Sequence, residues 1–174
     1  MTVYQVLLVG GCSGVGKTTV AWEVSALLQA EGVAHCLVEG DFMDQIHPAP
    51  AGDLDRSLIT ERNLAAVWAN YAALGQRRLI YTNTVSILEG GLIRRAMGGR
   101  PLDVTRVLLT AEHAVVAERL RLRETGSQLA PHLERSAKAA LRLDREAPPG
   151  TVRVATDGRT VGDVARRVRE ASGW

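Results

Sequence analysis

Apolar residues along the chain alternate between short unbroken runs and longer stretches with helical spacing. The short runs are apolar nearly throughout, as in parallel strands that are buried on both faces. They cover about residues 3–9, 34–38, 78–82, 104–110 and 151–155. Helical patterns separate them, over about residues 17–30, 57–74, 86–97, 111–124, 128–146 and from 160 onward. This alternation predicts one α/β domain over 1–174, a three-layer α/β/α architecture built on a five-stranded parallel sheet.

The helical patterns also predict which side chains face the core. In the helix over 17–30 the inward residues are Val20, Val24, Leu27 and Leu28. In the helix over 57–74 they are Leu64, Val67, Trp68, Tyr71 and Leu74. The helix over 128–146 is expected to bury Leu133, Ala137, Ala140 and Leu141, and the last helix Val161, Val164, Ala165 and Val168. That last helix begins at Thr160 with Asp163 three residues on, a capping-box spacing.

Composition narrows the class of protein. The chain has 174 residues, of which 46% are hydrophobic, which suits one domain with a sizeable core. No apolar run is long enough to span a bilayer, and the chain enters a strand directly, so we expect neither a membrane segment nor a signal peptide. The net charge is +2 and aromatic residues are 4%, which disfavours a nucleic-acid partner. The two cysteines form no disulfide framework and no metal-binding pattern, so we expect a reducing, cytoplasmic setting. The high content of arginine, alanine and glycine suggests a GC-rich bacterial genome.

The segment from Gly11 to Thr18 matches the P-loop spacing, with a glycine at each end of the variable stretch and Lys-Thr after it. It follows an apolar run and opens a helical pattern, the context that a P-loop requires. Its glycines let successive N–H groups turn inward around an anion, and the helix N-terminus favours negative charge. Lys17 would bridge the β- and γ-phosphates, and the Thr18 hydroxyl would hold Mg²⁺. The expected nucleotide-binding residues here are Gly11, Cys12, Ser13, Gly14, Val15, Gly16, Lys17, Thr18 and Thr19.

Asp41 is the strongest second site residue, because it stands at the carboxyl end of the strand that follows the P-loop helix. Ligands of doubly wound sheets gather at these strand ends. The Asp41 carboxylate could bind Mg²⁺ or accept a proton from an attacking hydroxyl; Glu39 and Asp44 compete for the role. The third strand ends in Tyr-Thr-Asn-Thr at 81–84, without the carboxylate that often orders Mg²⁺ there.

Three further features have expected roles. The long polar loop over 42–56 would determine which acceptor binds, since loops carry specificity on a shared scaffold. Arg56 and Arg62 flank it and could bind an anionic acceptor. Arg119 and Arg123 are four apart and share a helix face, whereas Arg121 points elsewhere. Guanidinium groups suit both phosphate binding and stacking on a base, although such a charged face is often only solvated.

Taken together, these segments resemble the small P-loop kinases: adenylylsulfate, gluconate and shikimate kinases, chloramphenicol phosphotransferase and the nucleoside monophosphate kinases. The resemblance covers nearly the whole chain. It rests on four pieces, at residues 10–19, 39–41, 118–126 and 155–165. The second is similar to the acidic strand end of these kinases, the third to the start of their lid, and the fourth to their adenine-side loop and final helix. No acceptor signature of any one subfamily is present.

The resemblance implies an ATP- and Mg²⁺-dependent kinase with a small-molecule acceptor, monomeric or homodimeric. It implies that Arg119 lies against the adenine, that Asp157, Gly158 and Arg159 border the base, and that Arg123 reaches the phosphates. Lys17, Asp41 and Arg123 would be catalytic, Thr18 and Asp41 would hold the metal, and 124–136 would form a mobile lid. An antibiotic-inactivating kinase fits equally. A nucleotide-binding switch or weak ATPase acting through a protein partner is the alternative outside the kinases.

Overall fold

The computed structural model describes residues 3–123, 126 and 128–174, and its five strands form one sheet. The strands are β1 (Tyr4–Gly10), β2 (Cys36–Glu39), β3 (Arg78–Thr82), β4 (Leu102–Thr110) and β5 (Val152–Ala155). They lie in the order β2-β3-β1-β4-β5, and every neighbouring pair is parallel. The predicted five-stranded parallel sheet is confirmed.

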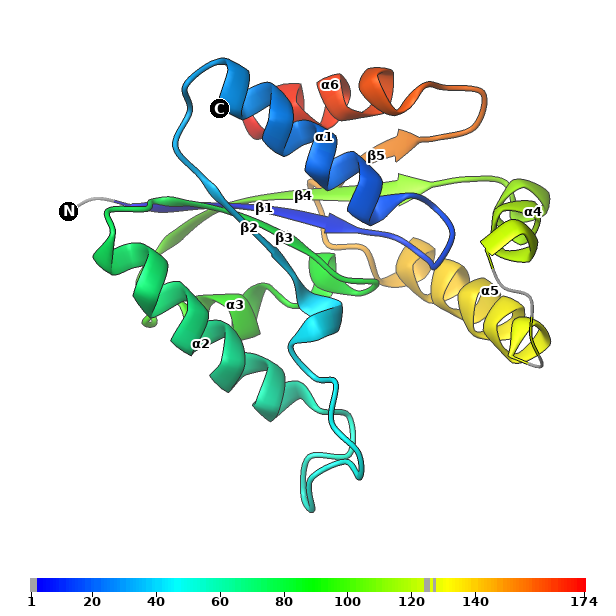
Figure 1. Ribbon diagram of the computed structural model, residues 1–174, viewed down its shortest axis with the longest axis horizontal. Coiled ribbons are helices and arrows are strands. Elements are labelled where there is room, and N and C mark those ends of the chain that lie inside the picture. Colours follow the sequence, from blue (N-terminus) through cyan, green and yellow to red (C-terminus); the bar gives the residue numbers. More distant parts are fainter. Residues whose placement is uncertain (1–2, 124–125, 127) are drawn as a thin grey trace.

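Six α-helices and two 3₁₀ turns connect the strands. They are α1 (Lys17–Ala30), η1 (Gly40–Phe42), α2 (Ser57–Ala73), η2 (Ser86–Leu88), α3 (Gly90–Ala96), α4 (His113–Arg123), α5 (Leu129–Glu146) and α6 (Val161–Ser172). In Figure 1, α1 and α6 cover one face of the sheet, while α2, α3 and α5 lie on the other. This is the predicted three-layer architecture. The weak helical pattern over 86–97 divides into η2 and α3, since Gly90 and Gly91 follow the first turn.

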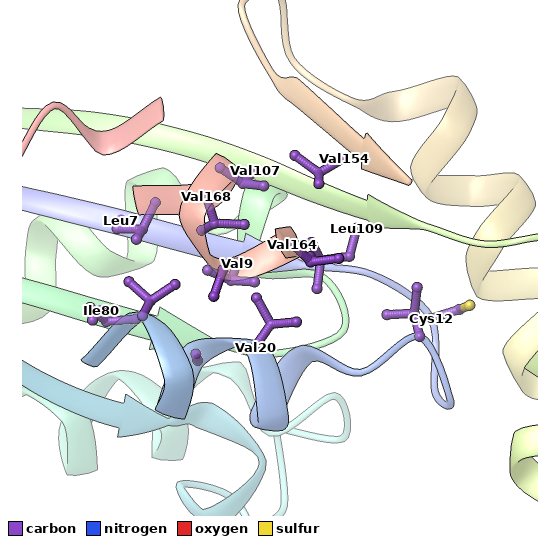
Figure 2. Packing of buried hydrophobic residues seen from close by; sticks show 14 of the residues in the cluster. Leu7, Val9, Cys12, Val20, Ile80, Val107, Leu109, Val154, Val164 and Val168 are labelled. Atoms are coloured by element: carbon purple, nitrogen blue, oxygen red, sulfur yellow. The ribbon is translucent and has the colours of Figure 1, made fainter. Parts of the chain in front are cut away.

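The strands are apolar on both sides because each face of the sheet has its own core. Along β1, Leu7 and Val9 pack with α1 and α6, whereas Val6 and Leu8 pack with α2 and α3. All four are at most 1% exposed. Figure 2 shows the first of these cores, where strand residues meet side chains of α1 and α6. Full burial of such a side chain contributes roughly 1.5–3 kcal/mol, so the two cores hold the sheet rigidly beneath the loops.

Three of the predicted helix faces are wrong in part. Helix α5 buries Ser136 and Leu143, whereas the predicted Ala140 and Leu141 are exposed, Leu141 at 73%. The reason is that α5 packs along its length on two different surfaces, the P-loop at Ser136 and the cluster around Leu108 at Leu143. Leu74 is 82% exposed because α2 has already ended at Ala73.

The last helix confirms its predicted start. The Thr160 hydroxyl accepts a hydrogen bond from the Asp163 backbone N–H at 3.1 Å, as the capping-box spacing predicts. Val164 and Val168 are buried as expected, while Val161, in the first turn, is 42% exposed.

The sheet determines where the site lies. Because all five strands are parallel, the P-loop after β1 and the turns after β2 to β5 meet at one edge.

Both cysteines, Cys12 and Cys36, are free and buried. Within the part of the chain that the structure describes, no helix has the length and apolarity needed to cross a membrane.

Candidate active site

The loop between β1 and α1 has the backbone of an anion-binding cradle. Gly14 and Gly16 have φ angles of 85° and 102°, which side chains other than glycine rarely adopt. A Cβ on Gly11 would lie 2.8 Å from the Leu109 carbonyl oxygen, so the loop packs against β4 only with glycine there. Helix α1 begins at Lys17 without a side-chain cap, which leaves its first N–H groups for a bound anion.

A cleft of about 590 Å³ opens over this loop. Most of the residues that the sequence predicts for the site line it, namely Ser13, Gly14, Val15, Gly16, Lys17, Thr18, Thr19, Asp41, Arg119, Arg123 and Arg159. Glu39, Phe42, His132 and Thr156 complete the polar and aromatic wall. The fold therefore brings the P-loop, the strand end after α1 and the arginines of α4 into one space.

The remaining predicted residues are close to lining residues in the sequence but do not line the cleft themselves. Gly11 and Cys12 are buried, with Cys12 only 6% exposed. Asp157 accepts a hydrogen bond from the Glu112 backbone N–H at 3.0 Å, which joins the turns after β4 and β5. Gly158 has a φ of 62° in the turn before Arg159. None of these four residues is among those that line the cleft.

Lys17 is the buried cation of the cleft. It is 9% exposed, and its Nζ donates to the Cys12 carbonyl oxygen at 3.2 Å. Burial lowers the pKa of Lys17, while the negative charge of Asp41 opposes the shift. A nearby phosphate would favour the charged ammonium, so the Lys17 side chain suits an anionic ligand.

Glu39 is the carboxylate next to the P-loop hydroxyl. Its Oε2 accepts from Thr18 Oγ1 at 3.2 Å, and its Oε1 accepts from Trp22 Nε1 at 2.9 Å. Hydroxyl and carboxylate oxygens are suitable Mg²⁺ ligands. The described residues contain no group of three or more His, Cys, Asp or Glu placed to hold a metal. A bound Mg²⁺ would therefore rest on Thr18, one or two carboxylates and the phosphates themselves.

Asp41 lines the same cleft from η1. Desolvation raises its pKa and Lys17 opposes that rise, while the negative charges of Asp44 and Glu39 add to it. The Asp41 carboxylate is therefore near both the Lys17 cation and the carboxylates of Asp44 and Glu39. A carboxylate with a raised pKa beside a phosphate-binding loop suits acceptance of a proton from a hydroxyl.

Two arginines of α4 line the cleft opposite Asp41's strand end. Arg119 donates through Nη1 to Thr156 Oγ1 at 3.0 Å and to the Val15 carbonyl oxygen at 3.4 Å. It therefore ties the P-loop to the turn after β5. Arg121 instead pairs with Glu118 at 3.7 Å on the solvent side of the helix.

Two residues that sequence reasoning missed lie beyond Asp41. Tyr81 of β3 is fully buried, and its hydroxyl packs so closely that a Cβ on Gly40 would lie 2.3 Å from it. Glu89 stands just before α3, and desolvation, with the charges of Asp41 and Asp44, raises its pKa to about 7. Tyr81 resembles a core residue in the sequence, and Glu89 falls in the weak pattern before Gly90, so neither carried a usable signal.

Comparisons with known proteins bear on the fold. No family model matches the sequence, and no curated protein matches it in sequence. Solved structures match over nearly the whole chain. One is the tunicamycin resistance protein of Deinococcus radiodurans, 21% identical, covering 98% of this chain and 96% of that one with a TM-score of 0.65.

Two others are kinases by their descriptions. A gluconokinase from Sinorhizobium meliloti 1021 is 19% identical, covers 99% of this chain and 94% of its own, and has a TM-score of 0.61. The APS kinase of Mycobacterium tuberculosis, solved with AMPPNP and APS, is 17% identical over the whole of both chains with a TM-score of 0.56. The chain has the fold of the small P-loop kinases. The predicted resemblance is confirmed at the level of the fold, while the acceptor of this P-loop kinase fold has to be argued from its own residues.

Proposed function

We propose that this protein is an ATP- and Mg²⁺-dependent kinase that transfers the γ-phosphoryl group to a hydroxyl of a small molecule. The observation that carries the proposal is that Lys17 and Asp41 line one cleft, where each shifts the pKa of the other. A phosphate cradle and a candidate proton acceptor therefore share one space. The fold's likeness to a gluconokinase and an APS kinase supports the reaction class.

The donor half consists of the P-loop and the arginines. The loop amides and Lys17 would hold the phosphates, and Arg123 would add positive charge at the same end of the cleft. Arg119, Asp157, Gly158 and Arg159 would border the base on the side of β5. Thr18 with Glu39, or Asp41, would hold Mg²⁺, which supplies charge neutralisation for phosphoryl transfer.

The acceptor half begins at Asp41. An acceptor oxygen forms a bond to the γ-phosphorus, the bond from phosphorus to the β–γ bridging oxygen breaks, and the hydroxyl proton passes to the Asp41 carboxylate. ADP leaves with the electron pair of the broken bond. Water must be kept from the phosphorus, a role we assign to the predicted lid over 124–136. Residues 124, 125 and 127 of that lid lie outside the described residues, and residues 129–136 belong to α5.

The test is a pair of variants. Lys17→Ala should weaken AMPPNP binding in calorimetry, because it removes the only side-chain cation of the P-loop. Asp41→Asn should bind AMPPNP with little change and lose acceptor-dependent ADP formation. Unchanged ATP binding and turnover in Lys17→Ala would overturn the proposal.

The missing carboxylate at the end of β3 slightly favours the alternative, a nucleotide switch or weak ATPase acting through a protein partner. The Glu39 carboxylate of β2 accepts a hydrogen bond from the Thr18 hydroxyl, so this side of the P-loop has a carboxylate even though β3 ends without one. The argument for the switch is weaker for that reason. The two functions differ in one measurement. Slow ADP formation that no alcohol accelerates would favour the switch. In either case we expect a cytoplasmic protein, monomeric or homodimeric, without a nucleic-acid or membrane partner.

A further inference from the structure

A second pocket lies behind the P-loop, between α4 and α5, with a volume of about 210 Å³. Its lining comes from the two helices, from the residue that follows β4 and from the P-loop itself. None of the lining residues is among those that line the cleft over the P-loop, so the loop separates two different spaces. The lining residues are Cys12, Ala111, His113, Val116, Ala117, Leu133, Ser136, Ala137, Ala140 and Leu141.

The lining of this pocket is nearly all apolar. Of the described residues that form it, seven are alanine, valine or leucine, and none is lysine, arginine, aspartate or glutamate. The Ser136 hydroxyl already donates to the Ser13 carbonyl oxygen at 2.8 Å, and a thiol such as that of Cys12 is only a weak donor. A water molecule needs about two to four polar partners to remain in such a space. The pocket therefore favours an apolar occupant over water.

Two residues connect the pocket to the cleft on the other side of the loop. Cys12 is a free cysteine that lines the pocket, and Figure 2 shows its sulfur pointing away from the other labelled core residues. Its backbone carbonyl oxygen accepts a hydrogen bond from Lys17 Nζ at 3.2 Å. Ser136 lines the pocket as well, and it holds the P-loop through the Ser13 carbonyl. An occupant of the pocket would therefore contact residues that shape the phosphate-binding loop.

The depth of the pocket suits a small molecule better than a protein surface. Cys12 and Ser136 form its floor and are 6% and 3% exposed, whereas His113, Ala140 and Leu141 are exposed at its rim. A flat surface of another protein would reach only that rim. An apolar cavity of about 150 Å³ is enough to bind benzene. A pocket of about 210 Å³ therefore has room for a substituted benzene.

We propose that this pocket binds a compact, uncharged apolar molecule of the size of a substituted benzene, and that the occupant promotes nucleotide binding. The pocket exists in the arrangement in which α5 is bonded to the P-loop and the loop has the backbone of an anion cradle. A molecule that fills the pocket stabilises that arrangement, because a ligand shifts a protein toward the form that it binds. The inference needs nucleotide binding at the P-loop and does not depend on phosphoryl transfer.

The chemical class of the ligand is tested with toluene, benzylamine and benzoate, which share a ring and differ in charge. Ligand-observed NMR near neutral pH measures their binding to the nucleotide-free protein. We expect toluene to bind, and the two charged probes to bind at least about tenfold more weakly, because burying a charge without a partner is costly. Absence of toluene binding, or equal binding of the three probes, would overturn the inference.

Variants and a thiol reagent locate the bound probe. Ala137→Leu fills the pocket and should abolish toluene binding, while Ala114→Leu, at an exposed position of α4 outside the pocket, should not. Thermal melting establishes that both variants are folded. Methyl methanethiosulfonate transfers its methylthio group to a thiolate and releases methanesulfinate. Toluene should slow this modification of Cys12 and leave that of Cys36 unchanged, as measured by peptide mass. Toluene binding that persists in Ala137→Leu, or equal rates at Cys12 with and without toluene, would place the probe elsewhere and overturn the inference.

Calorimetry tests the coupling to the nucleotide. Saturating toluene should tighten AMPPNP binding at least about fivefold, and AMPPNP should tighten toluene binding by the same factor, because coupling between two sites is reciprocal. In Ala137→Leu, toluene should leave the affinity for AMPPNP unchanged. An unchanged or weaker affinity in the wild type would overturn the proposed coupling. A wild-type dimer that Ala137→Leu dissociates would assign the pocket to a second copy of the chain, and would also overturn the inference.

Discussion

Ser136 of α5 donates its hydroxyl proton to the backbone carbonyl oxygen of Ser13 in the P-loop, at 2.8 Å, across 123 positions of sequence. Ser136 is only 3% exposed, so the bond is shielded from water. The predicted lid segment ends at this residue. The contact therefore holds α5 against the backbone of the loop that would bind the phosphates.

Ser136→Ala should weaken nucleotide binding. The substitution leaves the Ser13 carbonyl oxygen buried without its donor, at a cost of about 1 kcal/mol, or about fivefold in affinity. Calorimetry with AMPPNP measures the change. Ser172→Ala removes a comparable bond, from a hydroxyl to the Arg169 carbonyl oxygen at the end of α6, and should leave the affinity as it is. Equal affinities for wild type and Ser136→Ala would contradict a role in shaping the loop.

Trp22 should report on metal–nucleotide binding. Its indole N–H is bonded to the carboxylate that also accepts from the Thr18 hydroxyl, and its side chain is 57% exposed. If the Thr18 hydroxyl and the Glu39 carboxylate bind Mg²⁺, the Trp22 indole N–H loses its hydrogen bond to Glu39 or forms one with another acceptor. We expect Mg²⁺ and AMPPNP together to shift the tryptophan emission more than AMPPNP with EDTA.

Variants assign that signal to its source. The shift should disappear in Trp22→Phe and persist in Trp174→Phe, whose tryptophan lies at the chain end. Glu39→Gln should make the emission insensitive to Mg²⁺. A shift that survives in Trp22→Phe would show that the signal comes from elsewhere.

Most of the fold could be predicted because its signals are local. The inner strands β1 and β3 are apolar runs because helices cover both faces of the sheet there, and the P-loop motif marks the turn after β1. The face of α5 could not be predicted, because its burial depends on two surfaces that the rest of the chain builds. Its amphipathic pattern pointed to Leu141, whereas contact with Ser13 selects Ser136.

The P-loop could be predicted for the same reason, since one contiguous motif forms it. Glu39 and Asp41 were both visible, but their sequence positions do not say which carboxylate meets the Thr18 hydroxyl. No pattern in the sequence indicates that Tyr81 and Glu89 are site residues. They join Asp41 only through the pairing of β2 with β3 and the return of the chain through η2, contacts that no local pattern encodes.

Gly40→Ala should damage the acceptor side selectively. The added Cβ would lie 2.3 Å from Tyr81 Oη and 2.9 Å from the Thr82 carbonyl oxygen, so backbone or ring must move. Overpacking of this kind costs roughly 1–3 kcal/mol. We expect a lower midpoint of urea unfolding and loss of acceptor-dependent turnover, with AMPPNP binding less affected.

Gly162→Ala is the matched control for that variant. It lies in the first turn of α6, where an added Cβ meets Arg166 Nη1 at 3.6 Å and Thr160 Oγ1 at 4.0 Å, both ordinary van der Waals contacts. It should be neutral or slightly stabilising, as alanine is in helices. If Gly40→Ala were as stable and as active as Gly162→Ala, the close contact between Gly40 and Tyr81 would be without consequence.

Glu89 should make stability depend on pH in a predictable direction. Desolvation, with Asp41 and Asp44, raises its pKa from 4.5 to about 7, so the folded protein holds this proton more tightly than the unfolded chain does. The free energy of unfolding should therefore fall as pH rises from about 4.5 through about 7, by on the order of 3 kcal/mol for this group. Glu89→Gln, which cannot ionise, should lose that part of the pH dependence and be more stable than wild type near pH 8.

Urea unfolding of both proteins near pH 5 and pH 8 measures this difference. Comparing the two proteins at the two pH values separates the effect of Glu89 from that of Asp41, whose raised pKa acts in the same direction. Asp103→Asn, at the exposed start of β4, should follow the wild type, and parallel curves for wild type and Glu89→Gln would contradict a raised pKa of the Glu89 carboxyl.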